Sequence, residues 1–146
     1  MVETQTVNIK TKKIKLDFKD SKYATGRRKR SIARVWLKKG SGNIHVNGLK
    51  MNEYFKRPVH QIIVTRPLEI SEVATNYDVK CSVKGGGLSG QAGAIILGIS
   101  KALISHDENL KKNLKKDKLT TRDSRVVERK KYGHRKARRS FQFSKR

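Results

Sequence analysis

The segment YDVKCSVKGGGLSGQAGAIILGISKALIS, residues 77–105, contains the two clearest structural signals of the chain. Apolar and polar residues alternate over 77–84, as in a strand with one buried face. Three glycines at 85–87 end that strand. Helical spacing then places apolar residues on one side of a helix over about 89–105, at Ala92, Ile95, Ile96, Ile99 and Leu103. We therefore expect a strand followed directly by a core helix, with Cys81 as a small buried apolar residue.

The residues before this segment predict two more strands. Ile32, Arg34 and Trp36 alternate with apolar residues within 23–39, so the two sets occupy opposite faces of a strand. A glycine-containing turn at 39–42 and a short alternating segment at 43–48 follow. We expect these two strands to form a hairpin, and residues 51–55 to form one helical turn.

Two further helices are expected outside the central segment. Pro67 suits a first helical position and Glu69 would then lie in the first turn, which predicts a helix over about 67–75. Residues 105–108, Ser-His-Asp-Glu, fit a capping box for a later helix. Its apolar stripe consists only of Leu110 and Leu114, so we expect it to pack weakly.

The charge of the chain points to a polyanionic partner. The 146 residues include 36 Lys and Arg against 12 Asp and Glu, a formal net charge of +24, and only 35% are hydrophobic. Self-repulsion on this scale opposes compact folding unless a polyanion neutralises it. Nucleic acid is the obvious polyanion, because the chain has no lipid signal and no amphipathic basic helix for an anionic membrane.

The surplus charge is segregated along the chain. Residues 59–104 hold four basic and three acidic residues, whereas the sequence after Arg129 has no acid, and nine of the chain's last 18 residues are Lys or Arg. We expect a flexible extension at 1–22, a globular α+β RNA-binding domain at 23–119 and an extended basic tail at 120–146. The last 18 residues could span about 60 Å when extended.

The N-terminal segment has none of the features of a targeting or secretory signal. The first twenty residues include lysines, three acids and no arginine, unlike a mitochondrial transit peptide, and lack the apolar core of a secretory signal. No apolar run approaches ~20 residues, the length needed to cross a membrane. We expect a cytoplasmic protein, or one made inside an organelle, with no membrane partner.

A dinucleotide site is the sharpest enzyme hypothesis that the sequence offers. Residues 85–90 match G-x-G-x-x-G, but no later strand and no acidic residue complete a dinucleotide site, and Gln91-Ala92 cannot serve as the Lys-Ser/Thr of a phosphate-binding P-loop. The four histidines share no ligand spacing with the single cysteine. We expect no catalysis, no metal, no cofactor and no small-molecule substrate. Glycines at a helix start nevertheless let a phosphate approach backbone N–H groups closely.

Three motifs in order resemble those of the family of protein nine of the small ribosomal subunit, in its bacterial or organellar form. They are TGRRK at 25–29, VKGGG with SGQAGA at 83–94, and TRD through VERKK to the QFSKR terminus at 121–146. The resemblance runs from about Tyr23 to Arg146. Two positions depart from it: Ile96 stands where many relatives have Arg, and Ser140-Phe141 replaces a common Arg-Pro pair.

The resemblance implies a fold, a place and partners. The fold is a mixed sheet of about four strands with two principal helices, similar to the ribosomal S5 domain 2-like fold. The place is the head of the small subunit, on the 3′ major domain of its ribosomal RNA (rRNA), beside other head proteins. The end of the tail would approach the tRNA of the peptidyl site, which makes Ser144, Lys145 and Arg146 the residues nearest that tRNA.

Charge, glycines and resemblance together give the expected rRNA-binding residues. Phosphate contacts position a protein without reading sequence. Phe141 and Phe143 could stack on bases or anchor a neighbouring protein. Another basic nucleic-acid-binding architectural protein, on DNA, is the alternative, although readable DNA motifs are absent. The expected rRNA-binding residues are Arg27, Arg28, Lys29, Arg30, Arg34, Gly86, Gly87, Ser89, Gln91, Arg122, Arg125, Arg129, Lys130, Lys131, Arg135, Lys136, Arg138 and Arg139.

Overall fold

The computed structural model describes residues 19–145. Most of the expected extension at 1–22, and Arg146 of the tail, therefore lie outside the described residues. The elements are β1 (Lys22–Arg28), β2 (Ser31–Lys39), β3 (Ile44–Val46), β4 (Leu49–Lys50), α1 (Met51–Tyr54), α2 (Pro58–Ile70), β5 (Tyr77–Lys84), α3 (Leu88–His106), the 3-10 turn η1 (Glu108–Leu110) and α4 (Lys111–Lys116).

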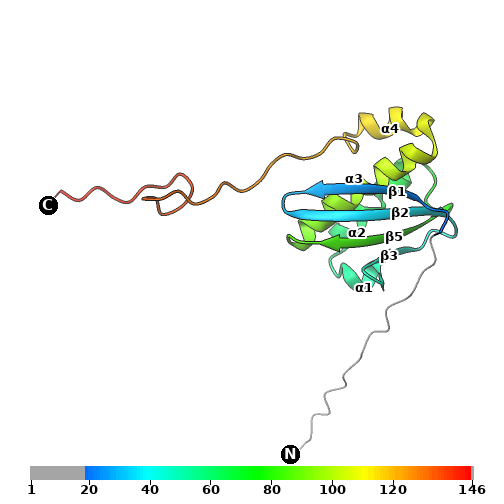
Figure 1. Ribbon diagram of the computed structural model, residues 1–146, viewed down its shortest axis with the longest axis horizontal. Helices are drawn as coiled ribbons and strands as arrows, with labels where there is room; N and C mark the ends of the chain where they lie inside the picture. The colour runs from blue at the N-terminus through cyan, green and yellow to red at the C-terminus, as the bar shows by residue number, and fades with distance from the viewer. Residues whose placement is uncertain (1–18, 146) are drawn as a thin grey trace, which may run out of the picture.

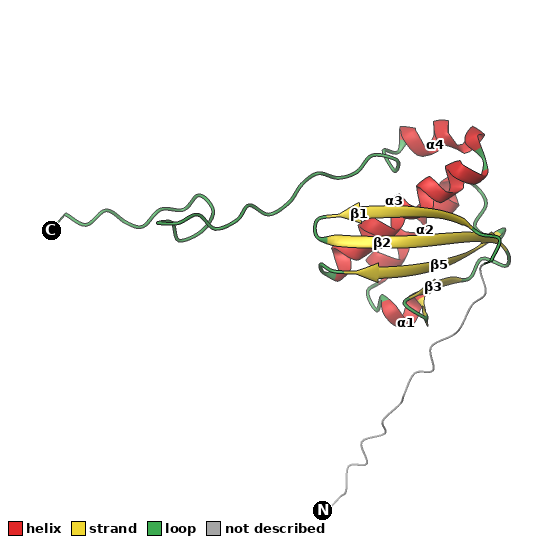
Figure 2. Cartoon of the chain, in the orientation of Figure 1, coloured by secondary structure: helices red, strands yellow, loops and turns green. Residues whose placement is uncertain are grey.

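The strands form one mixed sheet, and the long helices form a second layer behind it (Figures 1 and 2). The strand order is β1-β2-β5-β3-β4. β3 runs parallel to β5, and the other neighbouring strands are antiparallel. The expected α+β class, mixed sheet and two principal helices are confirmed, with five strands in place of about four. The architecture is compatible with the S5 domain 2-like fold.

The core lies between the sheet and α3. Ala33, Val35 and Leu37 of β2 are buried, and so are Val79, Cys81 and Val83 of β5, which confirms the predicted inner faces. β1 crosses α3 at Gly26 and Gly98, where a Cβ added to Gly26 would strike the backbone of α3. This close approach brings the β1–β2 turn and the start of α3 to the same end of the domain.

α3 is the core helix that residues 89–105 predict. It is also long and apolar enough, by length and composition, to cross a membrane, and it is the one such helix within residues 19–145. However, 61% of its apolar window is buried inside the domain, against the sheet. Its hydrophobicity is accounted for by the core.

The expected hairpin between β2 and β3 is wrong. β2 pairs with β1 on one side, from Lys22↔Leu37 to Arg28↔Ser31, and with β5 on the other. The true hairpin turn is Lys29-Arg30, where Lys29 adopts φ +50° without a glycine or asparagine to signal it. β5 separates β2 from β3 because its eight residues match nearly the full length of β2, whereas β3 has only three.

The helix expected over 67–75 is also wrong in its bounds. α2 begins at Pro58, which occupies the first helical position, and Pro67 lies inside the helix. Glu69 is consequently in the last turn. The capping box at 105–108 does not form either, because Ser105 lies inside α3, where its hydroxyl donates a hydrogen bond to the Lys101 carbonyl at 3.1 Å, and no side chain caps η1. The helical turn at 51–55 and the strand at 77–84 are confirmed.

Candidate nucleic-acid interface

The β1–β2 turn presents cations at one end of the sheet. Lys29 and Arg30 form the turn, and both are exposed. Arg27 of β1 and Arg34 of β2 are exposed on the face of the sheet that points away from the helices. The next residue after the turn, Ser31, is buried and donates a hydrogen bond from its hydroxyl to the Gly85 carbonyl at 3.0 Å. The turn and the glycine loop are therefore joined.

The three glycines of the loop differ in whether the backbone and the packing require glycine at their positions. Gly85 and Gly86 adopt φ +74° and +62°, the left-handed region that other residues occupy at a cost. A Cβ on Gly86 would also collide with the Ser31 hydroxyl. Gly87 has an ordinary extended backbone, and a Cβ there would meet nothing within 4 Å. Neither the backbone nor the packing of the chain requires glycine at 87, so the start of α3 is left bare at that position.

Ser89 and Gln91 hold this loop in place with their side chains. The Gln91 amide nitrogen donates to the Gly85 carbonyl at 3.2 Å, and its oxygen accepts from the Tyr54 hydroxyl at 2.8 Å. The Ser89 hydroxyl lies 3.1 Å from His60 Nε2. Both side chains are engaged within the protein: Gln91 fixes the glycine backbone at Gly85, and Ser89 joins the start of α3 to His60 of α2.

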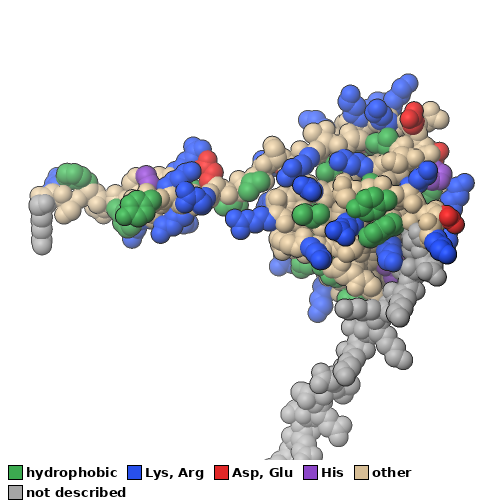
Figure 3. Space-filling view, in the orientation of Figure 1, with side chains coloured by type: hydrophobic (Ala, Val, Ile, Leu, Met, Phe, Trp, Pro, Cys, Tyr) green, Lys and Arg blue, Asp and Glu red, His purple; other side chains and the backbone are tan. Residues whose placement is uncertain are grey.

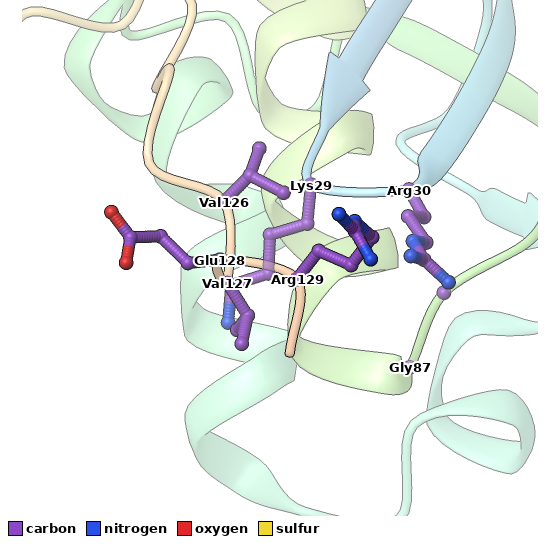
Figure 4. A pocket seen from close by; sticks show the side chains of 8 residues that line it. Lys29, Arg30, Gly87, Val126, Val127, Glu128 and Arg129 are labelled. Atoms are coloured by element: carbon purple, nitrogen blue, oxygen red, sulfur yellow. The ribbon is translucent and has the colours of Figure 1, made fainter. Parts of the chain in front are cut away.

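A pocket of about 370 Å³ lies where the turn, the glycine loop and the start of the tail meet. Lys29 and Arg30 line it from the turn, Gly86 and Gly87 from the loop, and residues 126–129 from the tail. Figure 4 shows the Arg30 and Arg129 guanidinium groups near each other, with the Lys29 ammonium on the other side of Arg129 and the Glu128 carboxylate pointing away. Glu128 accepts two hydrogen bonds from Arg138, at 2.9 and 2.8 Å. The lining of the pocket is mainly apolar, but three cationic residues and the start of α3 surround it, and these favour a phosphate beside it.

Arg28 occupies a different position from the other turn cations. Its guanidinium lies against Gly93 of α3 and forms an ion pair with Asp123 at 3.1 Å. Arg125 bonds the same carboxylate at 3.0 Å. These bonds, from Arg125 first and also from Arg28, hold the pKa of Asp123 well below its usual range. Arg28 therefore joins the domain to the first residues of the tail.

The tail runs away from the domain (Figure 1), and its Lys and Arg side chains from Arg122 to Lys145 are exposed. Two of its arginines are already paired, Arg125 with Asp123 and Arg138 with Glu128. The Arg135 guanidinium lies 5.8 Å from the centre of the Phe141 ring. Ser144 and Lys145 are exposed near the end. The other expected tail cations, all exposed, are Arg122, Arg129, Lys130, Lys131, Lys136 and Arg139.

Sequence reasoning missed two features of this interface. Asp123 was part of a recognised motif, but nothing in its spacing showed that it would reach Arg28, 95 residues earlier. The pairing of Tyr23 with Trp36, on the face of the sheet that points away from the helices, was also missed. Alternation had placed Trp36 and Arg34 on one face, and that signal could have identified the open face as a cationic surface. Within residues 19–145, no three His, Cys, Asp or Glu side chains gather in a way that could hold a metal.

The domain has a cationic turn, a glycine loop and a basic tail, and these three segments meet at one hollow. This combination is typical of the class of structural nucleic-acid-binding proteins. A comparison with protein families identifies the member of that class. The family model described as ribosomal protein S9/S16 matches residues 26–146. The chain belongs to this family, a family of structural proteins that bind rRNA in the small ribosomal subunit, where their partners are that RNA and other ribosomal proteins.

Proposed function

We propose that the chain binds the 3′ major domain of the small-subunit rRNA, in the head of the subunit, through residues 23–119 and the tail. In this proposal the end of the tail lies beside the tRNA of the peptidyl site, and neighbouring head proteins complete its surroundings. The ribosome is that of the cytoplasm, or of an organelle that encodes the chain. The protein performs no chemistry, and its contribution is to neutralise and hold folded RNA.

The observation that supports this proposal most directly is the pocket at the base of the tail. Lys29, Arg30 and Arg129 come from segments about 100 residues apart in sequence, yet they line one hollow beside the bare start of α3. Three cations and a helix N-terminus so close together repel one another unless an anion joins them. An RNA phosphate at Gly87 supplies that anion, and it fixes where the tail enters the RNA.

Beyond this pocket, the tail cations neutralise successive phosphates. We assign this contact to Lys130, Lys131, Arg135, Lys136 and Arg139, with Arg122 nearer the domain. Arg125 and Arg138 can exchange their carboxylate partners for phosphates once the tail is in place. Because such contacts carry no sequence information, specific binding comes from the shape of the RNA that receives the rigid domain.

Chemical footprinting of small-subunit rRNA with the full chain tests the location. We expect protection concentrated in the 3′ major domain and persisting in the presence of excess competitor DNA. Protection scattered over the RNA, or abolished by the DNA, contradicts the proposal and favours a general nucleic-acid-binding protein.

The role of the tail tip is tested by removal of residues 144–146. Subunits carrying the truncated chain should assemble normally and bind tRNA in the peptidyl site modestly less tightly, because only the last cations are lost. The double change Lys115→Gln and Lys116→Gln on α4 is the control, since it removes two exposed charges that lie outside the tail and the pocket. Lost assembly with the truncated chain would assign the tip to RNA folding.

A further inference from the structure

The face of the sheet opposite α2 and α3 carries side chains that the pocket and tail do not explain. The strand register places Tyr23, Trp36, Lys80 and His45 in one row across β1, β2, β5 and β3. Figure 3 shows apolar side chains near the middle of this face with Lys and Arg side chains around them. We call this surface the open face.

The centre of the open face is an aromatic pair, in which Tyr23 is exposed and Trp36 is partly buried. The rings of Tyr23 and Trp36 have their centroids 5.4 Å apart, tilted by 46°, and Tyr23 is 51% exposed. Ile32, two strand positions from Arg34 on the same face, is 43% exposed. Large apolar side chains gathered on one exposed face indicate a surface that meets a partner.

The charges around the pair indicate what that partner is. Lys80 lies over the Trp36 ring, with its Nζ 5.9 Å from the ring centroid. The face has one acid, Asp78, whose carboxylate accepts backbone hydrogen bonds from Ser41 and Asn43 at 3.0 and 2.8 Å. The remaining charged side chains of β1, β2 and β5 on this face are all cations, at Arg27, Arg34, Lys38 and Lys84. The partner of the open face is therefore anionic.

Cations interspersed with exposed rings match unpaired nucleic acid better than an acidic protein. Each base has a flat π-face that can stack on an aromatic side chain, while the backbone beside it brings one phosphate per nucleotide. Several single-stranded RNA readers use aromatic side chains on the exposed face of a sheet in this way. A base-paired helix hides its base faces, so it could meet the cations but not the rings.

We infer that the open face binds an unpaired segment of the small-subunit rRNA. Bases stack against Tyr23 and Trp36, and the flanking phosphates lie against Arg34 and Lys84. This inference rests on the proposed function and adds a second RNA contact. That contact binds unpaired bases on the face of the sheet opposite the helices. The pocket at the base of the tail and the open face would then both bind RNA, on two sides of the β1–β2 turn.

Trp36 is the only tryptophan of the chain, so its fluorescence reports on the open face alone. The experiment adds purified small-subunit rRNA to the full chain and follows Trp36 emission and its accessibility to acrylamide. We expect strong quenching and loss of acrylamide access as the complex forms. Ultraviolet crosslinking should attach nucleotides to the tryptic peptides 23–27 and 35–38.

Affinity supplies a second readout. The double change Tyr23→Leu and Trp36→Leu removes the rings and keeps apolar bulk, and it should weaken rRNA binding about tenfold, in line with the loss of base stacking. The slope of affinity against salt should not change, because no phosphate contact is lost. The matched control is Val59→Ala with Ile62→Ala, two side chains on α2 that are 64% and 62% exposed, and its affinity should equal that of the unaltered chain.

Other outcomes overturn the inference. Formation of the complex with Trp36 emission and accessibility unchanged would remove the open face from the RNA contact and leave the proposed function intact. Trp36 could instead be protected from acrylamide already in the free chain. If deletion of residues 1–18 abolished that protection, the open face would be assigned to the chain's own N-terminal segment. Failure of the full chain to bind the rRNA at all would reject the proposed function itself.

Discussion

The Arg28 guanidinium donates two hydrogen bonds to one oxygen of Asp123, at 3.1 and 3.3 Å. This bond crosses 95 positions of sequence and joins the β1–β2 hairpin to the first residues of the tail. It has two consequences. It engages Arg28, one of the expected rRNA-binding residues, within the protein, and it directs the start of the tail so that residues 126–129 reach the glycine loop.

Replacement of Asp123 by Asn should release the start of the tail without unfolding the domain. The Asp123 and Arg28 side chains are 26% and 29% exposed, and ion pairs that remain in contact with solvent contribute little to stability. We therefore expect an unchanged Tm and faster trypsin cleavage after Arg122 and Arg125. Glu108→Gln, an exposed acid on η1, is the charge-matched control. A large drop in Tm would show that the pair supports the fold.

The same ion pair should resist acid. Because the pKa of Asp123 is lowered in the folded protein, its pair is fully present above the unfolded value of about 3.9 and is lost only as pH falls toward the folded pKa. Carboxyl-carbon NMR should show Asp123 titrating below that value. Titration at the ordinary value for an aspartate would mean that Arg125 and Arg28 do not hold the carboxylate in solution.

Substitutions at Gly87 should separate RNA binding from folding. A Cβ at 87 enters open space, so Gly87→Ala and Gly87→Val should lower stability by no more than about 1 kcal/mol, the cost of a weaker helix cap. Their rRNA affinity should fall with side-chain size, by about tenfold for valine, because a charged hydrogen bond is lost.

Gly86→Ala provides the contrast to these variants. Its φ of +62° makes alanine cost at least about 1–2 kcal/mol in stability. Equal rRNA affinity for the alanine and valine variants at 87 and the unaltered chain would exclude a phosphate at the bare start of α3.

Cys81 should be inert until the domain unfolds. Burial raises the pKa of its thiol far above the usual value, so the folded protein disfavours the thiolate. The contribution of Cys81 to the free energy of unfolding should be constant below pH about 8.5 and fall above it, because its thiol ionises there in the unfolded chain alone. The stability difference between the unaltered chain and Cys81→Ala should narrow over that range. Rapid labelling by a thiol reagent at pH 8 without denaturant would contradict this burial.

The sequence predicted elements whose signals are local, and it failed where distant segments compete. The alternation at 77–84 and the apolar stripe of α3 fixed two elements with little error. The hairpin was misassigned because residues 39–42 contain glycine, whereas the true turn at Lys29-Arg30 has no turn residue. The start of α2 was misplaced because two prolines offered a first helical position and only Pro58 takes it.

The sequence predicted the charges of the candidate interface but not how its segments come together. Net charge and motifs identified the turn, the glycine loop and the tail as cationic or anion-binding segments. Their convergence depends on the Gly26–Gly98 approach of β1 to α3 and on the Arg28–Asp123 pair. Both are contacts between residues more than 70 positions apart, for which a single sequence carries no pairing signal.

The salt dependence of rRNA binding tests the central claim most directly. Log affinity should fall linearly with log salt, by about 0.7–0.9 for each phosphate neutralised. The triple change Lys29→Gln, Arg30→Gln and Arg129→Gln should make that slope shallower by about 2–3. An affinity almost independent of salt, or a slope that the triple change leaves untouched, would contradict a cationic pocket that holds RNA phosphates.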